Sequence, residues 1–339
     1  MPNSDYLANM DGTIVRTLAD WGAFFGSDGK LHPIIELVDM ENTILDDIMW
    51  REANHKDGHQ TAIRTGLPSV YWRRLYKGIP VSKSEVSIVK DPVGRLEAKS
   101  LIDAVLLEIN QSQAKAYRFQ EAKAFMESMR QELSTAIFYG SIKDNPDGIH
   151  GLAPRYADIN APHVVDAGGT TGPMTSIWGV VWGENDVTGI FPKDSIAGLQ
   201  HKDLGEYEAY DTEGNGFRVV GDLYSWNVGL STRDWRSVVR IGNIPVDALM
   251  LKKGDAGFID LHRLTIIAKN QIPPEKRARL KWYVNQEVMT ALELQASDAG
   301  NVHLHYGDLF RSKGVPFLHG CPVRQNDAIL TTEELLQAA

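Results

Sequence analysis

Two pairs of potential metal ligands lie near the C-terminal end of the sequence. His303 and His305 would share one face of a strand at i and i+2, and His319 and Cys321 could do the same. A zinc site needs three or four ligands, and no further ligand is spaced to help. Cys321 has no basic residue nearby in the sequence except His319, so a small buried thiol is the preferred interpretation. We therefore predict no metal site, no cofactor and no nucleophilic cysteine.

The sequence motifs of catalysis and nucleotide binding are incomplete or missing. Gly214-Asn215-Gly216 begins a dinucleotide-binding fingerprint, but Val219 stands where the third glycine is needed. A phosphate-binding loop, a zinc-protease helix motif and a nucleophile elbow are not found. We predict that the protein is not an enzyme.

A cluster of aromatic and basic side chains follows residue 70. Residues alternate from Val70 to Lys77, a turn signal follows at Lys77–Pro80, and alternation resumes from Val81 to Lys90. This pattern predicts a long hairpin with aromatic and basic side chains on both faces. A lone two-stranded ribbon is marginally stable in water. We rank a contact surface for another chain first, a solvated ribbon second and a nucleic-acid stacking site third.

Longer elements must position this hairpin. Residues 111–139 contain no Gly or Pro and carry an apolar stripe at helical spacing, so they predict a helix about 43 Å long. Asn110 or Ser112 can cap its start, and Gly140 can end it in a left-handed conformation. Residues 175–244 read almost wholly as strands and predict a long antiparallel sheet beside the helix, with a turn at Gly214–Gly216.

The last third of the chain predicts a compact α/β unit. Its expected helices cover residues 255–269 and 286–296, and its expected short strands cover 280–284, 302–306, 316–318 and 322–324. By contrast, the first 50 residues contain only short amphipathic pieces, at 31–38 and 43–49. Those residues resemble an arm that packs on something else.

Composition excludes several functional classes. The 339 residues are 43% hydrophobic and 23% charged, as in an ordinary soluble protein, and no apolar run is long enough to cross a bilayer. No export signal is indicated, and a single cysteine fits a reducing compartment. The formal charge of −9 argues against a protein that wraps nucleic acid. Residues 1–60 have a net charge of −7 and residues 61–100 one of +5, so these segments can attract each other within or between chains.

Four stretches resemble the major capsid protein of tailed bacteriophages, with the Hong-Kong-97-type shell fold. They are Arg64-Thr65-Gly66-Leu67-Pro68 at the hairpin start, Ser176–Gly183 with Gly189-Ile190-Phe191-Pro192, Asp234-Trp235-Arg236 with Val239-Arg240-Ile241, and Gly320–Arg324 with Asp327–Leu330. The resemblance covers about residues 40–332.

The resemblance implies an α+β subunit with an N-terminal arm (1–50), an extended β-hairpin loop (51–98), a peripheral domain (99–244) with the long spine helix and long sheet, and an axial domain (245–339). The expected order of strands and axial unit resembles a podophage-like subgroup with reordered connectivity. The family resemblance also implies self-assembly into the hexamers and pentamers of an icosahedral shell around double-stranded DNA. Implied partners are scaffold and portal proteins, a decoration protein, and packaged DNA through weak contact. The shell would be assembled in the host cytoplasm, and nothing implies a membrane.

We predict that subunit contacts involve aromatic and basic residues of the hairpin and the long helix: Trp72, Arg73, Arg74, Tyr76, Lys77, Lys83, Arg118 and Arg130. The alternative is a soluble, β-rich ligand- or carbohydrate-binding protein, in which tryptophans stack on sugars: Trp178, Trp182, Trp226 and Trp235.

Overall fold

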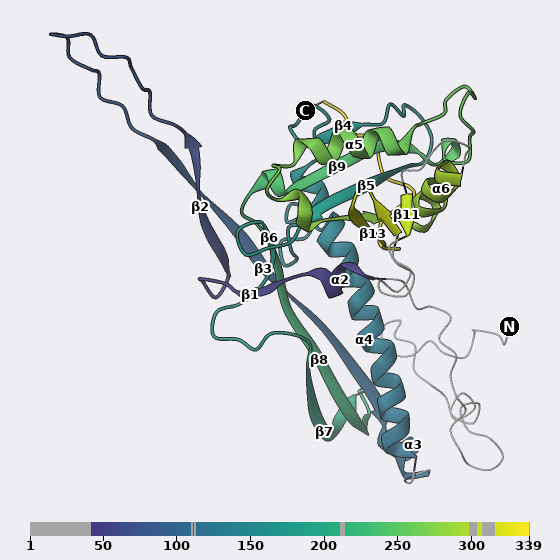
Figure 1. Ribbon diagram of the computed structural model, residues 1–339. Coiled ribbons are helices and arrows are strands. Elements are labelled where there is room, and N and C mark those ends of the chain that lie inside the picture. Colours follow the sequence, from purple (N-terminus) through teal and green to yellow (C-terminus); the bar gives the residue numbers. More distant parts are fainter. Residues whose placement is uncertain are drawn as a thin grey trace. The chain divides into compact units, whose positions relative to one another are not determined.

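A computed structural model describes residues 42–109, 111, 113–210, 214–297, 304–306 and 316–338, and it divides the chain into two compact units (Figure 1). The first unit comprises Leu96–Glu132 and Gly198–Trp226, with Met1–Asp39 outside the described residues. The second unit comprises Met40–Arg95, Leu133–Ala197 and Asn227–Ala339. Three elements continue from one unit into the other, namely β3 (Glu85–Asp103), α4 (Ala114–Tyr139) and β8 (Gly216–Thr232).

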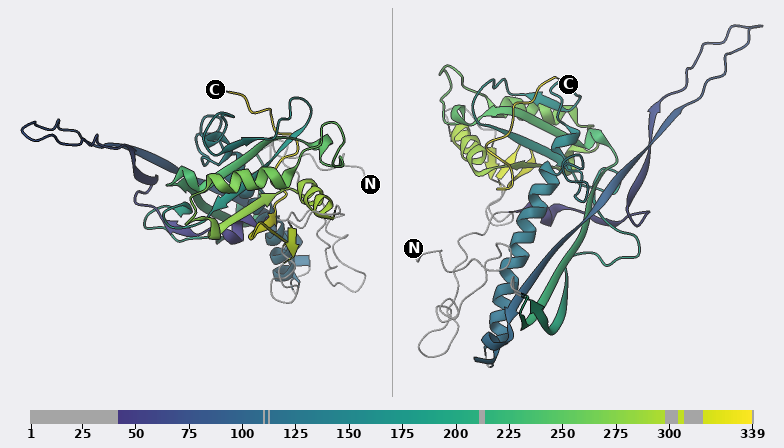
Figure 2. Two further views of the ribbon diagram at one scale, coloured as in Figure 1. Left: turned by 45° about the horizontal axis from the view of Figure 1, so that its top comes forward. Right: turned by 180° about the vertical axis from the view of Figure 1, so that it is seen from behind.

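The core of the second unit is a seven-stranded sheet with the order β11-β12-β13-β10-β5-β9-β4. Its strands are β4 (Val164–Asp166), β5 (Met174–Val181), β9 (Val238–Pro245), β10 (Leu280–Val284), β11 (Leu304–Tyr306), β12 (Pro316–Leu318) and β13 (Cys321–Gln325). Every residue of β5 is buried, as expected for a strand covered on both faces. Helix α5 (Leu261–Gln271) packs on β9 and β4, and α6 (Gln286–Ser297) packs on α5 (Figure 2).

The C-terminal part of α4 belongs to this same core. Phe138 is fully buried, and its ring lies 6.1 Å from the ring of Trp178 on β5. The helix ends before Gly140, as predicted, but Gly140 is not in the left-handed conformation. A Cβ atom at Gly140 would lie 2.5 Å from the carbonyl oxygen of Ala136, so close backbone packing explains the glycine.

The other sheet has six strands, with β7 (Gln200–Tyr210) paired to β8 beside the path β1-β6-β8-β3-β2. In the second unit, β1 (Trp50–Glu52) is parallel to β6 (Val187–Phe191), and β2 (Gly58–Gly66) is antiparallel to β3. The β2–β3 register places Gly58 opposite Pro92 and Gly66 opposite Glu85. Helix α2 (Ile44–Asp47) precedes β1.

The first unit is small and is built around α3 (Ala104–Ile109), the N-terminal part of α4 and the β7–β8 hairpin. Ile102 and Tyr117 form a small buried apolar cluster in it. Phe125 of α4 stacks on Tyr224 of β8, with ring centroids 5.8 Å apart. The hairpin predicted around Gly214–Gly216 is confirmed, because Tyr210 pairs with Gly216.

Of the two strands predicted for the basic hairpin, the first (Val70–Lys77) is wrong, and the second (Val81–Lys90) is confirmed only from Glu85, where β3 begins. The paired strands are β2 and β3, whereas residues 67–84 form no strand, and the turn lies at Leu75–Tyr76 rather than at Lys77–Pro80. The alternation from Val70 to Lys77 reflects β-prone side chains that have no ladder partner among the described residues.

The single long sheet predicted over 175–244 is also wrong. Strands β5 and β9 belong to the seven-stranded sheet, whereas β6, β7 and β8 belong to the six-stranded one. The reason is non-local pairing, because β5 lies between β9 and β10, and β10 comes about one hundred residues later in the chain. The domain boundaries 1–50, 51–98, 99–244 and 245–339 stay predictions.

The predicted helices are confirmed with shifted bounds. The long helix begins at Ala114 rather than at residue 111, and the helix predicted at 255–269 spans Leu261–Gln271. The latter begins late because the Asp260 carboxylate accepts a hydrogen bond from the Arg263 N–H and caps the first turn. The predicted arm lies mostly outside the described residues.

Candidate functional site

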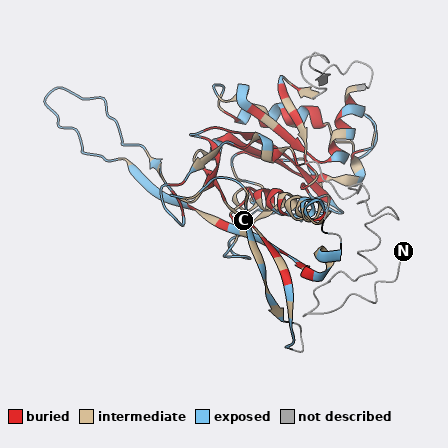
Figure 3. Ribbon diagram, turned by 90° about the horizontal axis from the view of Figure 1, so that it is seen from below, coloured by how far each residue is buried: buried red, intermediate tan, exposed pale blue. Residues whose placement is uncertain are grey.

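The most exposed segment of the second unit is the hairpin loop, residues 67–84, which extends beyond the ends of β2 and β3 (Figures 1 and 3). Trp72 is 104% exposed and Tyr76 is 101% exposed relative to the free residue. Its other exposed large apolar residues are Leu67, Val70, Tyr71, Leu75, Ile79 and Val81. The segment also carries four basic residues and no acidic residue. A monomeric protein rarely exposes so continuous an apolar segment, so this loop is the candidate contact surface of the second unit.

Few internal bonds hold the hairpin loop. The Lys77 N–H donates to the Arg74 carbonyl at 3.2 Å and closes a turn in which Tyr76 has a φ of 64°. A positive φ is unfavourable for an aromatic residue. The hydroxyl of Ser82 donates to the carbonyl of Ser69 at 2.9 Å and joins the two arms of the loop.

The structure places the eight predicted interface residues in two different settings. Six of them are exposed on the hairpin loop: Trp72, Arg73, Arg74, Tyr76, Lys77 and Lys83. The other two, Arg118 and Arg130, lie on α4 in the first unit and have carboxylate partners there. No contact with another chain tests these residues, and their interface role stays a prediction.

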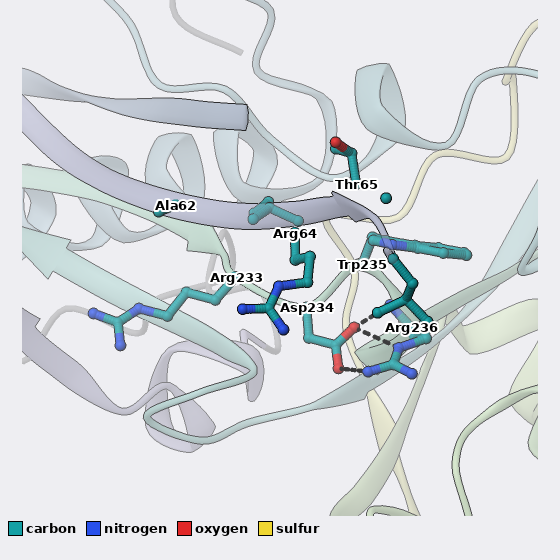
Figure 4. A pocket seen from close by; sticks show the side chains of 10 residues that line it. Ala62, Arg64, Thr65, Arg233, Asp234, Trp235 and Arg236 are labelled. Atoms are coloured by element: carbon teal, nitrogen blue, oxygen red, sulfur yellow. Dashed lines mark hydrogen bonds and ion pairs between the residues drawn. The ribbon is translucent and has the colours of Figure 1, made fainter. Parts of the chain in front are cut away.

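A cavity of about 550 Å³ lies where the hairpin loop leaves β2. We call it the basal pocket, and it is lined by residues 62–67 and 233–236 (Figure 4). Two of the stretches quoted above, which begin at Arg64 and at Asp234, therefore meet at one site. In Figure 4 the Arg64 side chain extends from β2 toward the segment that carries Asp234.

The carboxylate of the basal pocket is fully engaged. Asp234 accepts two hydrogen bonds of 3.0 Å from the Arg236 guanidinium, and the Lys276 ammonium lies 2.5 Å from it. Burial raises the pKa of Asp234, but the hydrogen bonds from Arg236 and Lys276 outweigh this effect and lower the pKa to about 2. Lys276 also lies 2.5 Å from buried Asp186.

The other two arginines of the basal pocket lack such a partner. Arg233 lies 2.6 Å from Nε2 of buried His59. Burial, and then the charge of Arg233, lowers the pKa of His59, which favours a neutral imidazole. The backbone of Arg64 pairs with Val86 of β3, but its exposed side chain forms no hydrogen bond or ion pair with the described residues. The lining therefore has a formal charge of +2, from three arginines and one aspartate.

A second cavity of about 440 Å³ lies within the first unit, between α4 and the β7–β8 hairpin. Its floor contains Arg118, which donates to the buried carboxylate of Asp222 at 2.7 and 3.1 Å and lies 3.0 Å from Asp203. Hydrogen bonding to Asp222 raises the pKa of Arg118. The sequence reading missed this role, because nothing in the local pattern relates residue 118 to residue 222.

Comparisons with known proteins identify the chain. Residues 26–337 match the family described as major capsid protein GP7. The chain belongs to the GP7 family of major capsid proteins. A chain in a cryo-EM structure of bacteriophage Epsilon15 is 26% identical, with a TM-score of 0.75, over 97% of this chain and 99% of that chain. No curated protein sequence matches.

More distant structures share less of the chain. A chain of the SrpI encapsulin complex from Synechococcus elongatus is 9% identical, with a TM-score of 0.43, over 68% of this chain and 96% of that one. A capsid chain of a native GTA particle is 10% identical, with a TM-score of 0.42, over 68% of this chain and 100% of that one.

Family membership confirms the predicted capsid role and the Hong-Kong-97-type, mixed helix-and-sheet fold. This capsid protein is a structural component of the virion and not an enzyme. The comparisons give no support to the carbohydrate-binding alternative. Trp178 is fully buried and Trp182 nearly so, which leaves neither indole free to stack on a sugar.

The other residues singled out for chemistry have structural surroundings. Burial raises the pKa of the Cys321 thiol, as expected for an unreactive core cysteine. His303 lies outside the described residues, as does the side chain of His305. Within the described residues, no three His, Cys, Asp or Glu side chains gather as metal ligands, and no helix is both long and apolar enough to cross a membrane.

Proposed function

We propose that this capsid protein assembles as rings of six and five copies into an icosahedral shell around double-stranded DNA, and that the hairpin loop of each copy lies on an adjacent copy. The observation that carries the proposal is the exposure of the loop. Its Trp72 and Tyr76 side chains contact almost nothing in their own chain, and its cations have no carboxylate partner among the described residues.

The energetics favour burial of this loop on a neighbour. Burying a large aromatic side chain removes about 150–250 Å² from water, and each buried Leu or Val adds about 1.5–3 kcal/mol. A loop with two fully exposed aromatic rings and several exposed aliphatic residues can therefore contribute several kcal/mol to each contact between copies. Basic side chains on such a loop orient it against an acidic surface.

We extend the proposal to the other components of the virion. A container of this kind needs scaffold and portal proteins for its assembly, and a decoration protein can bind its outer surface. The formal charge of −9 supports weak, non-specific contact with packaged DNA, because a wall that bound phosphate tightly would hinder packaging. We propose that assembly takes place in the host cytoplasm.

The test replaces residues 67–84 with an Asn-Gly turn. Gly66 and Glu85 are register partners, so a two-residue turn can join β2 to β3 without altering the ladder. We expect a chain with an unchanged circular dichroism spectrum and a thermal transition within a few degrees of wild type. Negative-stain electron microscopy and light scattering should show no shells.

A matched control changes the loop without removing its apolar residues. The double variant Ser69→Ala/Ser82→Ala loses the hydroxyl that joins the two arms, and it should still form shells. Shells of wild-type diameter from the chain that lacks residues 67–84 would contradict the proposal.

A further inference from the structure

We propose that Asn215 is the site of a self-catalysed covalent modification, in which its side-chain amide is lost as ammonia and the carboxylate of Glu208 acts as the base. The substrate is the chain's own Asn215-Gly216 pair, and water is the only co-reactant. The site lies in the first unit, at the end of the β7–β8 hairpin (Figure 1). The inference is independent of the proposed shell, and it rests on the Asn-Gly pair and on a carboxylate placed against its glycine.

The residue types at this site favour ring closure. Asn215-Gly216 is the only Asn-Gly pair in the sequence. The backbone nitrogen of a glycine can reach Cγ of the preceding asparagine because a glycine has no Cβ atom to hinder the approach. The attack closes a five-membered ring, and a reaction between two groups of the same chain gains from their high effective concentration. The sequence therefore supplies both the electrophile and the nucleophile.

The backbone at Asn215 is not constrained by strand pairing. Asn215 lies outside any strand, and the β7–β8 ladder reaches only to Gly216, which is the partner of Tyr210. Gly214 has a φ of 84°, in the left-handed region, so the chain turns directly before Asn215. Asn215 and Gly216 are both exposed, and water can therefore reach the reacting atoms.

Glu208 places a carboxylate against Gly216. The register pairs Glu208 with Arg218 and Tyr210 with Gly216, so Glu208 and Gly216 are diagonal neighbours on one face of the hairpin. A Cβ atom at Gly216 would lie 2.9 Å from Cδ of Glu208 and closer still to its Oε1. The carboxylate therefore occupies the space that a side chain at position 216 would need, next to the residue whose N–H must lose its proton.

The Glu208 carboxylate is available as a base. Arg218 is its register partner, but the Arg218 guanidinium forms its ion pair with Glu206 instead. The exposed side chain of Glu208 has no hydrogen bond or ion pair with the described residues. A carboxylate that is held beside a reacting group, and is not engaged by a cation, can accept a proton in the transition state.

The reaction is balanced without an oxidant or a reductant. Glu208 accepts the proton of the Gly216 N–H while the Gly216 nitrogen forms a bond to Cγ of Asn215. The Cγ–Nδ2 bond then breaks, the same proton passes to the leaving nitrogen, and ammonia departs from a succinimide ring. Water opens the ring at Cγ to give aspartate, or at the main-chain carbonyl to give isoaspartate. Each event adds one negative charge, so a modified copy has a formal charge of −10 instead of −9.

The two products change the hairpin in different ways. Aspartate leaves the path of the backbone unaltered and places a second carboxylate near that of Glu208. Isoaspartate carries the backbone through Cγ, which inserts one extra carbon atom directly before β8 and disturbs the pairing of Tyr210 with Gly216. Ageing of the protein should therefore alter the charge and the pairing of this end of the hairpin.

Peptide mass spectrometry of the full-length protein tests the site. The tryptic peptide 203–218 contains Asn215 as its only asparagine, and a zero-time sample corrects for conversion during digestion. During incubation at mildly alkaline pH we expect release of ammonia and conversion of Asn215 to a mixture of aspartate and isoaspartate. The conversion should be at least tenfold faster than that of Asn160, which is exposed but precedes an alanine. Equal rates, or no conversion at Asn215, would overturn the site.

Two variants of Glu208 test the base. Glu208→Gln should slow the conversion of Asn215 at least fivefold. Glu208→Asp keeps the charge but withdraws the carboxylate from Gly216, and it should slow the conversion to a similar extent. A purely electrostatic role predicts the opposite sign for Glu208→Gln, because removal of a nearby negative charge eases the loss of the amide proton. The matched control is Glu132→Gln, at an exposed position of α4, which should leave the rate unchanged.

Unfolding the chain in guanidinium chloride separates the contribution of the fold from that of the Asn-Gly pair. Unfolding removes Glu208 from its place beside Gly216, so the wild-type chain should convert faster when folded, whereas Glu208→Gln should not. An unchanged or faster rate for folded Glu208→Gln would overturn the role of Glu208. The same conclusion would follow from wild-type conversion that is slower in the folded chain than in the unfolded chain.

Discussion

Truncation of Trp72 gives a direct measure of what the hairpin loop contributes to assembly. The side chain is 104% exposed, so Trp72→Ala removes no contact from the free chain and should leave its thermal stability unchanged. Complete burial of 150–250 Å² of aromatic surface corresponds to about 4–6 kcal/mol at 25 cal/mol/Å². Interface truncations usually realise part of that value, about 2–4 kcal/mol for an anchor residue.

In the proposed shell the loss applies once per subunit, because each copy would donate one hairpin loop. A loss of 2–4 kcal/mol weakens the contact about 30- to 700-fold. We expect the critical concentration for shell assembly, measured by light scattering and sedimentation, to rise by that factor. Trp72→Phe retains most of the ring and should raise it less than tenfold. An unchanged critical concentration for Trp72→Ala would refute the assignment of the loop as an anchor, as would a lower melting temperature of the free chain.

Two further predictions concern the second unit. Glu333→Gln should lower the free energy of unfolding by about 3–5 kcal/mol in urea titrations. The reason is that the buried Arg240 guanidinium, which lies 2.7 Å from the Glu333 carboxylate, would lose its countercharge. An effect below about 1 kcal/mol would contradict this prediction. Burial and the charge of Arg233 hold the pKa of His59 below 6.5 in the folded chain, so the unfolded chain binds the proton more readily. The free energy of unfolding should therefore be at its full value above about pH 6.5 and should decline as the pH falls toward the folded pKa. His59→Gln should flatten that decline, and an equally steep pH profile for the variant would exclude His59 as its source.

The local sequence pattern was sufficient to predict a helix or strand wherever the contacts that stabilise that element are local. The periodic apolar stripe of α4 predicted its C-terminal end at Tyr139 and its start within three residues of Ala114. The strand at 280–284 was predicted at its observed bounds. Both elements are continuous apolar patterns that terminate at clear signals, which are Gly140 for the helix and Asn285 for the strand.

The errors arose where the pairing partner is remote in the sequence or is not found among the described residues. Alternation in residues 70–77 shows that the side chains suit a pleated surface, but it carries no information about which strand will pair with them. In the same way, β5 and β9 read as part of one meander with β8, although β5 also pairs with β10. The basal pocket was not predictable from spacing, because Arg64 and Asp234 are 170 positions apart.

We expect the charges and the apolar residues of the hairpin loop to have different roles in the proposed assembly. Its cations are exposed and form no ion pair with a carboxylate of the described residues. Salt at physiological strength therefore screens their interactions beyond about 8 Å. Apolar burial is not screened and grows with the area removed from water. Affinity should therefore depend mainly on Trp72, Tyr76 and their aliphatic neighbours, whereas the arginines and lysines select the orientation of the loop and the rate of encounter. It follows that raising the salt concentration should slow shell assembly far more than it destabilises completed shells.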